Sequence, residues 1–248
     1  MAGVHAAAAR GFARSAEAYD RARPEYPAVA VAWLANRLAL GPGRTVVDLA
    51  AGTGKLTRPL AAATRAEVIA VEPVAEMRAR IGPAAARVLD GTAEAIPLPA
   101  GSADAVTVAQ AFHWFDGPAA LAEIHRVLRR DGALALVWNR RPLEHPVHAA
   151  IERIVAPHRG DTPAHKSGAW RAALAATTLF GALEERTFEH SRPHDADALA
   201  DRVGSTSYVA ALGDGPRAEV LAAVRALAAD GPVELPYVCE VFVCERCP

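Results

Sequence analysis

Four short apolar runs in the first 140 residues constrain the fold of this chain most tightly. They occupy residues 45–49, 67–72, 105–110 and 133–138, and a weaker run at 87–90 lies between the second and the third. Each run is continuously apolar rather than alternating, which is typical of strands covered on both faces. Helical patterns separate the runs, so the sequence predicts a mostly parallel, doubly wound α/β sheet. One of these helices is expected to begin after Asp116 and to run past Leu128 to a stop at Gly132.

The second half of the chain has a different pattern. Residues 140–169 are rich in Pro, His and Gly and are expected to form an irregular cover. Helices are predicted at 170–178, 195–203 and 216–229, and strands at 183–190 and 233–245. This order predicts two further strands on the same sheet rather than a separate domain. We therefore expect a single domain over residues 1–248, with an N-terminal helical cap at about 1–40.

The most informative stretch is the turn that follows the first apolar run, Val-Val-Asp-Leu-Ala-Ala-Gly-Thr-Gly-Lys-Leu-Thr at 46–57. A buried strand carries Asp48 near its end and enters a turn of small residues that opens a helix. Small residues let backbone N–H groups approach a ligand closely, and in doubly wound sheets such a turn lies at the ligand crevice. The stretch thus predicts a ligand site, with a plain strand–helix turn as the alternative.

Three ligand classes use turns of this kind. A phosphate-binding P-loop requires Gly and Ser/Thr where Leu49 and Leu56 stand, and a dinucleotide fingerprint that starts at Gly52 requires Gly or Ala where Thr57 stands. The third class binds S-adenosylmethionine (SAM) and has an acid at the strand end followed by a short Gly-rich turn. Asp48 is placed to attract the ammonium and sulfonium charges of SAM, directly or through water.

Two further turns fit the adenosine half of such a ligand. Glu72 closes the second apolar run, where its carboxylate is placed to accept hydrogen bonds from both ribose hydroxyls. NAD enzymes share this acid, so it indicates an adenosine ribose rather than a methyl donor. After the weaker run at 87–90, the backbone of Thr92 and Ala93 is placed to pair with an adenine edge, with Glu94 or Asp90 near its amino group. A surface turn is the alternative interpretation there.

Together these stretches resemble the class I SAM-dependent methyltransferases, most closely the small-molecule branch with ubiquinone/menaquinone-type and trans-aconitate-type enzymes. The similarity lies in residues 18–27, 46–57, 71–73, 91–99, 109–115 and 122–132. It implies a seven-stranded sheet whose last strand is antiparallel, and Gln110 under the sulfonium. The residues it implies at the cofactor are Asp48, Ala50, Gly52, Thr53, Gly54, Glu72, Pro73, Thr92, Ala93, Glu94 and Gln110. The chain departs from the pattern at Ala50, where many relatives have the first Gly.

Methyl transfer from a sulfonium is an in-line displacement from an already activated donor, and its product is S-adenosylhomocysteine (SAH). The protein mainly has to align the acceptor and exclude water, so a general base is optional. His113 is the candidate catalytic residue, because it is placed to deprotonate a hydroxyl or bind a carboxylate; the alternative is that it packs the loop. The candidate acceptor-binding residues are Tyr19, Arg23, Trp114, Arg140, Arg141 and Tyr208.

Composition narrows the partners. The formal net charge is −1 and no basic stripe is present, which argues against a nucleic acid, as does the lack of an Asn/Asp-Pro-Pro-aromatic element at residues 110–113, where the run at 105–110 ends. No apolar run is long enough to predict a membrane span. The chain has three cysteines, of which Cys239 and Cys244 are expected on opposite strand faces as reduced thiols of a cytoplasmic protein.

We therefore expect a SAM-dependent methyltransferase of a small-molecule acceptor, without a metal site, as a monomer or homodimer. Two alternatives remain open from the sequence. One is an NAD(P)-linked oxidoreductase, and the other is a SAM-binding protein that transfers no methyl group.

Overall fold

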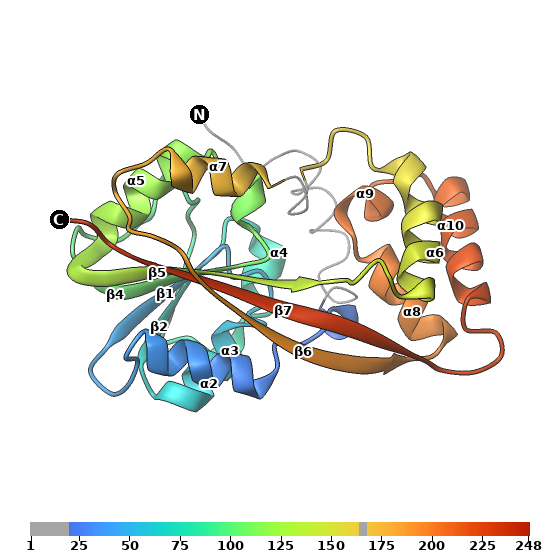
Figure 1. Ribbon diagram of the computed structural model, residues 1–248, viewed down its shortest axis with the longest axis horizontal. Helices are drawn as coiled ribbons and strands as arrows, with labels where there is room; N and C mark the ends of the chain where they lie inside the picture. The colour runs from blue at the N-terminus through green and yellow to red at the C-terminus, as the bar shows by residue number, and fades with distance from the viewer. Residues whose placement is uncertain (1–19, 164–167) are drawn as a thin grey trace.

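The computed structural model describes residues 20–163 and 168–248, which form a seven-stranded sheet flanked by helices (Figure 1). The strand order is β3-β2-β1-β4-β5-β7-β6. The strands are β1 (Thr45–Leu49), β2 (Glu67–Val71), β3 (Arg87–Leu89), β4 (Ala103–Ala109), β5 (Leu128–Arg140), β6 (Glu184–His194) and β7 (Val233–Glu245). The first five strands pair in parallel, and β7 is antiparallel to both β5 and β6. The predicted doubly wound sheet with an antiparallel last strand is confirmed.

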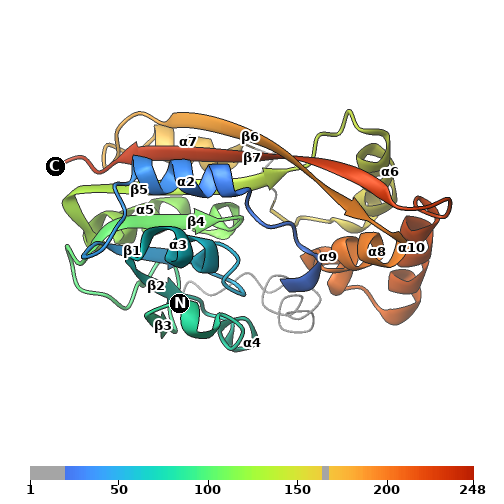
Figure 2. The same ribbon diagram turned by 90° about the horizontal axis from the view of Figure 1, so that it is seen from below.

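Helices cover both faces of the sheet. The α-helices of the described residues, including those of a second group described below, are α2 (Ala28–Arg37), α3 (Thr57–Thr64), α4 (Ala75–Arg78), α5 (Gly117–Val127), α6 (Pro146–Val155), α7 (Ala169–Ala175), α8 (Ala196–Gly204), α9 (Ser207–Ala210) and α10 (Asp214–Ala226). On one face, α5 and α7 pack Leu121 and Trp170 against the sheet, and on the other, α2 and α3 pack Leu34 and Leu60 (Figure 2). All five residues of β1 are buried, which explains why that strand is apolar apart from Thr45 and Asp48.

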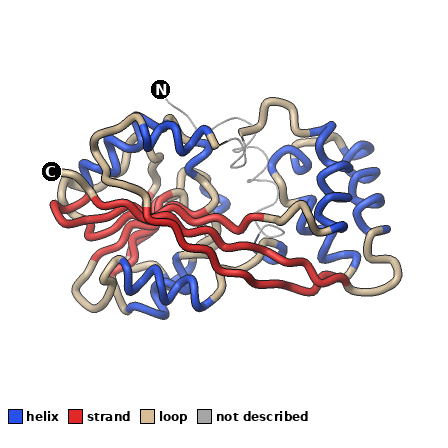
Figure 3. The backbone as a smooth tube through the Cα atoms, in the orientation of Figure 1, coloured by secondary structure: helices blue, strands red, loops and turns tan. Residues whose placement is uncertain are grey.

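A second group of helices lies at the far end of the longest strands. Strands β6 and β7 extend beyond the parallel strands, and α6, α8, α9 and α10 gather around their ends (Figure 3). These helices share a separate apolar cluster that includes Leu199, Val224 and Tyr237. We call these four helices the helical lobe.

Two expectations about local structure were wrong. Helix α5 ends at Val127 instead of Gly132, because Leu128 is buried and already pairs with Ala103 as the first residue of β5. Residues 140–169 are not wholly irregular, since α6 and a 3-10 turn at Ala156–His158 lie within them. The Pro- and His-rich composition hid Ile151 and Val155, which face the cluster of the helical lobe.

Strand β7 places its cysteines as the alternating pattern predicted. Cys239 and Cys244 belong to the apolar clusters on opposite faces of the sheet. Burial raises the pKa of both thiols to about 12, so neither side chain is a nucleophile at neutral pH. Over the described residues, no helix has the length and apolar character needed to cross a membrane.

Candidate functional site

Three adjoining pockets lie where β1, β2 and β4 end. The first, here the sheet-edge pocket, is lined by the predicted residues Ala50, Gly52, Glu72, Pro73, Thr92, Ala93, Glu94, Gln110 and Trp114. The second, the loop pocket, is lined by Arg23, Ala50, Gly52, Thr53 and Gln110, together with Lys55, Asn139 and Arg202. The third, the arginine pocket, contains Arg23, Gln110, His113, Trp114, Arg140 and Tyr208, together with Arg141, Arg159 and Arg202. Tyr19 lies outside the described residues.

The loop after β1 is built from its backbone. The amide of Ala51 donates to the Val71 carbonyl at 3.1 Å, and the amide of Gly54 donates to the Ala51 carbonyl at 2.9 Å. Ala50 has a φ of 54°, in the left-handed region that normally favours glycine, and Gly52 has a φ of 58°. The chain therefore adopts the turn at Ala50 despite the strain of a Cβ atom there.

Asp48 lies behind this loop rather than in a pocket. Its Oδ2 accepts a hydrogen bond from the Thr57 hydroxyl at 2.5 Å, and its Oδ1 accepts one from the Thr107 hydroxyl at 3.2 Å. The side chain is 1% exposed, and burial raises its pKa to about 6. Asp48 is not among the residues that line the three pockets, so its contacts fix the start of α3.

Glu72 lies at the wall of the sheet-edge pocket. One carboxylate oxygen accepts from the Gly52 amide and the other from the Val74 amide, both at 2.9 Å. Burial raises the pKa of this carboxyl group, and the two backbone donors oppose that rise. Each oxygen keeps a further lone pair, so the carboxylate can accept from a ligand diol while it holds the loop in place.

The turn at residues 91–96 forms the other wall of the sheet-edge pocket. A Cβ atom at Gly91 would lie 2.5 Å from Cδ of Pro97, so no larger residue fits without a shift. The Glu94 carboxylate accepts from the Asp116 amide at 3.1 Å, which ties this turn to the start of α5. The predicted residues Thr92, Ala93 and Glu94 thus share one pocket with Glu72.

Gln110 lies where all three pockets meet. It follows β4 directly, and its amide donates to the Val137 carbonyl at 2.8 Å. Its φ of 60° is again in the left-handed region, which an L-residue with a side chain rarely adopts. A strained residue at a junction of pockets is typical of functional sites.

His113 lines the arginine pocket, in the 3-10 turn after Gln110. The Trp138 indole N–H points at His113 Nδ1 over a long distance of 3.5 Å. Because an indole nitrogen only donates, this contact favours an unprotonated Nδ1 and hence, in the neutral ring, a hydrogen on Nε2. In that tautomer His113 offers a ligand a donor rather than a base.

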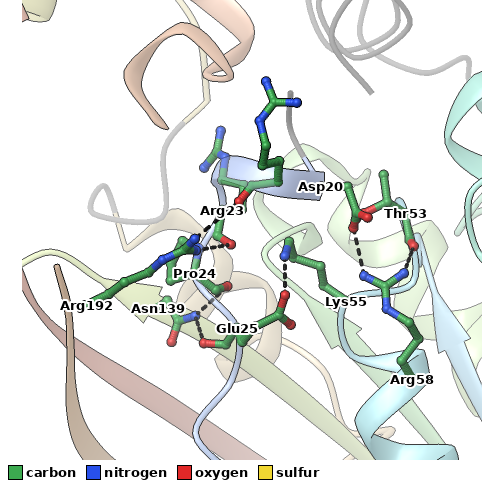
Figure 4. Close-up of polar contacts among 10 residues, drawn as sticks. Asp20, Arg23, Pro24, Glu25, Thr53, Lys55, Arg58, Asn139 and Arg192 are labelled. Atoms are coloured by element: carbon green, nitrogen blue, oxygen red, sulfur yellow. Dashed lines mark hydrogen bonds and ion pairs between the residues drawn. The ribbon is translucent and has the colours of Figure 1, made fainter. Parts of the chain in front are cut away.

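The N-terminal segment, residues 20–26, crosses the loop and closes one side of the loop pocket (Figure 4). The Asp20 carboxylate accepts from the Thr53 hydroxyl and from Arg58, both at 2.7 Å, and Lys55 donates to Glu25 at 2.5 Å. The sequence reasoning missed these pairs, although acids in the segment and basic residues in the loop were a visible signal.

Two basic residues of the arginine pocket, Arg159 and Arg202, were also missed, whereas the sequence reasoning had included Arg141 with Arg140 and Tyr208. Arg202 belongs to α8, between the buried Leu199 and Val203, and is itself 6% exposed. An Arg on the apolar face of a predicted helix was the signal that could have identified it. Arg140 is at the pocket as predicted, but its guanidinium donates to Glu240 at 2.7 Å. Gly54 is not among the lining residues of the three pockets, and it packs against Ile81.

Comparisons with known proteins identify the family of this chain. Residues 47–136 match the family model described as a methyltransferase domain. An uncharacterised methyltransferase of Mycobacterium tuberculosis is 37% identical over 95% of this chain and 94% of its own length.

Solved structures give the same result. A putative type II methyltransferase from Anaeromyxobacter dehalogenans is 26% identical, with a TM-score of 0.65 over 91% of this chain and 97% of that one. A geranyl diphosphate methyltransferase solved in complex with SAM shares the fold at 17% identity, with a TM-score of 0.51 over 88% of this chain and 85% of that one. The chain therefore belongs to the class I SAM-dependent methyltransferases.

Proposed function

We propose that this enzyme binds SAM across the sheet-edge and loop pockets and transfers its methyl group to a small molecule in the arginine pocket. The observation that carries this proposal is the position of Gln110, which lines all three pockets. A ligand that extends from the sheet-edge pocket to the loop pocket passes Gln110 at its midpoint. Its reactive centre then faces the third pocket.

Each part of SAM has partners of suitable chemistry. Thr92 and Ala93 lie at the adenine, Glu72 accepts from the ribose hydroxyls, and the backbone at Gly52 and Thr53 borders the methionine portion. Asp48 acts indirectly, because it holds the start of α3 and adds a buried negative charge behind the cationic ligand. A solved neighbour of the same fold contains SAM, which supports SAM as the cofactor.

The reaction requires alignment more than acid–base chemistry. A lone pair of the acceptor attacks the methyl carbon as the C–S bond breaks, and the bonding electrons remain on sulfur, which leaves neutral SAH. If the acceptor is a hydroxyl, its proton passes to solvent or to a neighbouring group. His113 is the candidate partner there, and its contact with Trp138 favours a role as a hydrogen-bond donor that orients the acceptor.

The side chains that border the arginine pocket support a small molecule as the acceptor. The apolar rings of Trp114, Trp138 and Tyr208 and the basic residues of the helical lobe border the arginine pocket. A ligand held there is within reach of Gln110 and is partly shielded from water, as an in-line displacement requires.

Calorimetry with SAM, SAH, NADH and NADPH, followed by transfer of labelled methyl from SAM into fractionated metabolite extract, tests the proposal. We expect SAM and SAH to bind, no response to either nicotinamide cofactor, and label in a low-molecular-mass product. Binding of NADH or NADPH alone would support the oxidoreductase alternative. Binding of SAM without label in any fraction would support a SAM-binding protein that transfers no methyl group.

A further inference from the structure

The arginine pocket contains more positive than negative charge. Five arginines line it, Arg23, Arg140, Arg141, Arg159 and Arg202, against the two acids Glu144 and Glu152. Glu240 outside the pocket neutralises Arg140, and Arg23 donates to the neutral hydroxyl and carbonyl of Ser205 at 3.1 and 3.0 Å. Whether Arg141 and Arg159 are neutralised therefore depends on how they share the carboxylate of Glu152.

Glu152 serves two arginines at unequal distances. Both of its carboxylate oxygens accept from Arg159 at 2.8 Å, whereas Arg141 approaches only to 3.7 Å. The side chain of Arg141 is 21% exposed. Burial and the nearby charge of Arg202 lower the pKa of Arg141. A single carboxylate that is committed to Arg159 leaves Arg141 incompletely neutralised.

Arg202 is the more exceptional of the two. Its Nε and Nη1 atoms are buried and have no hydrogen-bond partner in the described part of the chain. The residue nevertheless borders both the loop pocket and the arginine pocket. A buried guanidinium with two unpartnered nitrogens is strongly unfavourable, so its presence next to a second arginine points to an anion that completes the site.

We propose that the methyl acceptor is an acid, whose carboxylate or phosphate group binds between Arg141 and Arg202. The inference rests on the proposed function and adds the chemical class of the substrate. The anionic group anchors the acceptor at the helical lobe, and the rest of the molecule extends along Trp114 and Trp138 toward Gln110. Planar guanidinium groups suit this task because they bind such oxyanions through two parallel hydrogen bonds.

Arg202 also borders the loop pocket, where the methionine carboxylate of SAM would lie, so the test must separate the two ligands. Arg141 lines the arginine pocket but is not among the loop-pocket residues. Substitution of Arg141 should therefore affect the acceptor alone. Substitution of Arg202 should affect the acceptor and can also weaken the cofactor.

The experiment passes metabolite extract over an anion-exchange resin at neutral pH and assays each fraction with labelled SAM. We expect acceptor activity in the retained fraction, and phosphatase treatment of that fraction distinguishes a phosphate from a carboxylate. For this fraction, Arg141→Met should raise KM about 10- to 100-fold, the scale of a lost charged hydrogen bond. The KM of Arg141→Lys should lie between those of the wild type and Arg141→Met. The SAH affinity of both variants should differ from that of the wild type by less than about twofold. The matched control is Arg153→Met, an exposed arginine of α6.

Acceptor activity in the unretained fraction, or an unchanged KM in Arg141→Met, would overturn this inference and leave the methyltransferase function intact. Loss of SAH binding by the wild-type protein would instead overturn the proposed function. If the extract yields no product, calorimetric titration of SAH-loaded protein with succinate and with inorganic phosphate decides the question. Binding that Arg141→Met abolishes supports the site, and equal heats in both proteins contradict it.

Arg202→Met provides a second, independent readout. Because an apolar side chain replaces an unpaired buried charge, the variant should unfold at a higher temperature than the wild type while its KM for the acceptor rises. A purely structural arginine would give the opposite result, a lower unfolding temperature.

Discussion

Two acids at neighbouring strand ends have different tasks. Asp48 is enclosed by the Thr57 and Thr107 hydroxyls, whereas Glu72 borders the sheet-edge pocket. Both carboxyl groups have a pKa raised by burial, but only Glu72 holds two backbone amides of the loops that shape the pocket. The two residues therefore respond differently to substitution.

Glu72→Ala is expected to weaken SAM binding by about 1–3 kcal/mol, because the ribose loses its acceptors and the amides of Gly52 and Val74 lose theirs. Isothermal titration with SAH measures the change. The matched control is Glu76→Ala, an exposed acid of the following helix, which should bind SAH as the wild type does. Unchanged affinity in a folded Glu72→Ala variant would contradict the ribose assignment.

Asp48 should make stability depend on pH. Its folded-state pKa of about 6 lies above the ordinary value of 3.8, so between these values the folded protein binds more protons than the unfolded chain. The free energy of unfolding should therefore fall as pH rises through this window, by on the order of 3 kcal/mol for about two pKa units.

Asp48→Asn removes this titration and provides the comparison. The unfolding free energy of the variant relative to the wild type should rise between pH 4 and pH 7, as measured by urea denaturation. A difference that is flat across this range would show that the buried carboxyl group is not the titrating group.

Substitution of His113 tests whether this residue acts as a general base or as a hydrogen-bond donor. Its contact with Trp138 favours a hydrogen on Nε2, so Gln, which keeps a donor, should retain more activity than Ala. We expect kcat to fall less than about tenfold in His113→Gln and to fall further in His113→Ala. Equal losses in both variants, together with an acidic limb in the wild-type pH–rate profile that both variants lack, would indicate a general base.

At the scale of elements, the N-terminal segment stabilises the Gly-rich loop. Burial by itself would raise the pKa of Asp20, but the hydrogen bonds from Thr53 and Arg58, together with the charges of Arg58 and Lys55, outweigh it and hold the pKa below its ordinary value. Asp20→Asn should loosen the loop and weaken SAH binding by about 1 kcal/mol, which calorimetry detects. Asp201→Asn removes only the ion pair with Arg21 at a more exposed place and serves as the control. A variant of Asp20 with full SAH affinity would indicate that the segment does not support the cofactor site.

The elements that were predicted correctly share a strong local signal. The buried strands around Val46 and Val68 are mostly apolar, and the Gly-rich turn directly follows the first of them, so both are visible in the sequence. Helix α6 was missed because the residues that bury it, Ile151 and Val155, lie among Pro and His. The length of β5 was missed because Leu128 fits a helix face as well as a strand.

The residues of the candidate site also differ in how strong a local sequence signal they have. Glu72 and Gln110 follow strands, and their place at the crevice is a consequence of parallel topology. Arg202 and Asp20 reach the pockets only through tertiary contacts between segments that are far apart in sequence. Such contacts leave little pattern in the local sequence, so these two residues could be identified only from the structure.

At the scale of the whole molecule, cofactor and acceptor chemistry lie on different parts of the fold. The predicted SAM-binding residues follow β1, β2, β3 and β4, whereas Arg202 and Tyr208 reach the arginine pocket from the helical lobe. The lobe has its own apolar cluster, joined to the sheet through β6 and β7 (Figure 1). A defect confined to the lobe should therefore affect the acceptor more than SAM.

Leu199→Ala tests this division. Leu199 is fully buried in the cluster of the helical lobe, so the substitution should cost about 2–5 kcal/mol of local stability and displace Arg202 on the same helix. KM for the acceptor should rise at least about tenfold, and SAH affinity should fall by a smaller factor, because Arg202 reaches the cofactor only at the edge of the loop pocket. Leu60→Ala, at an equally buried leucine of α3, the helix that follows the Gly-rich loop, is the matched control and should lower SAH affinity instead. If both variants lose the two ligands in parallel, the lobe and the sheet unfold as one cooperative unit, and the acceptor site has no separate structural support.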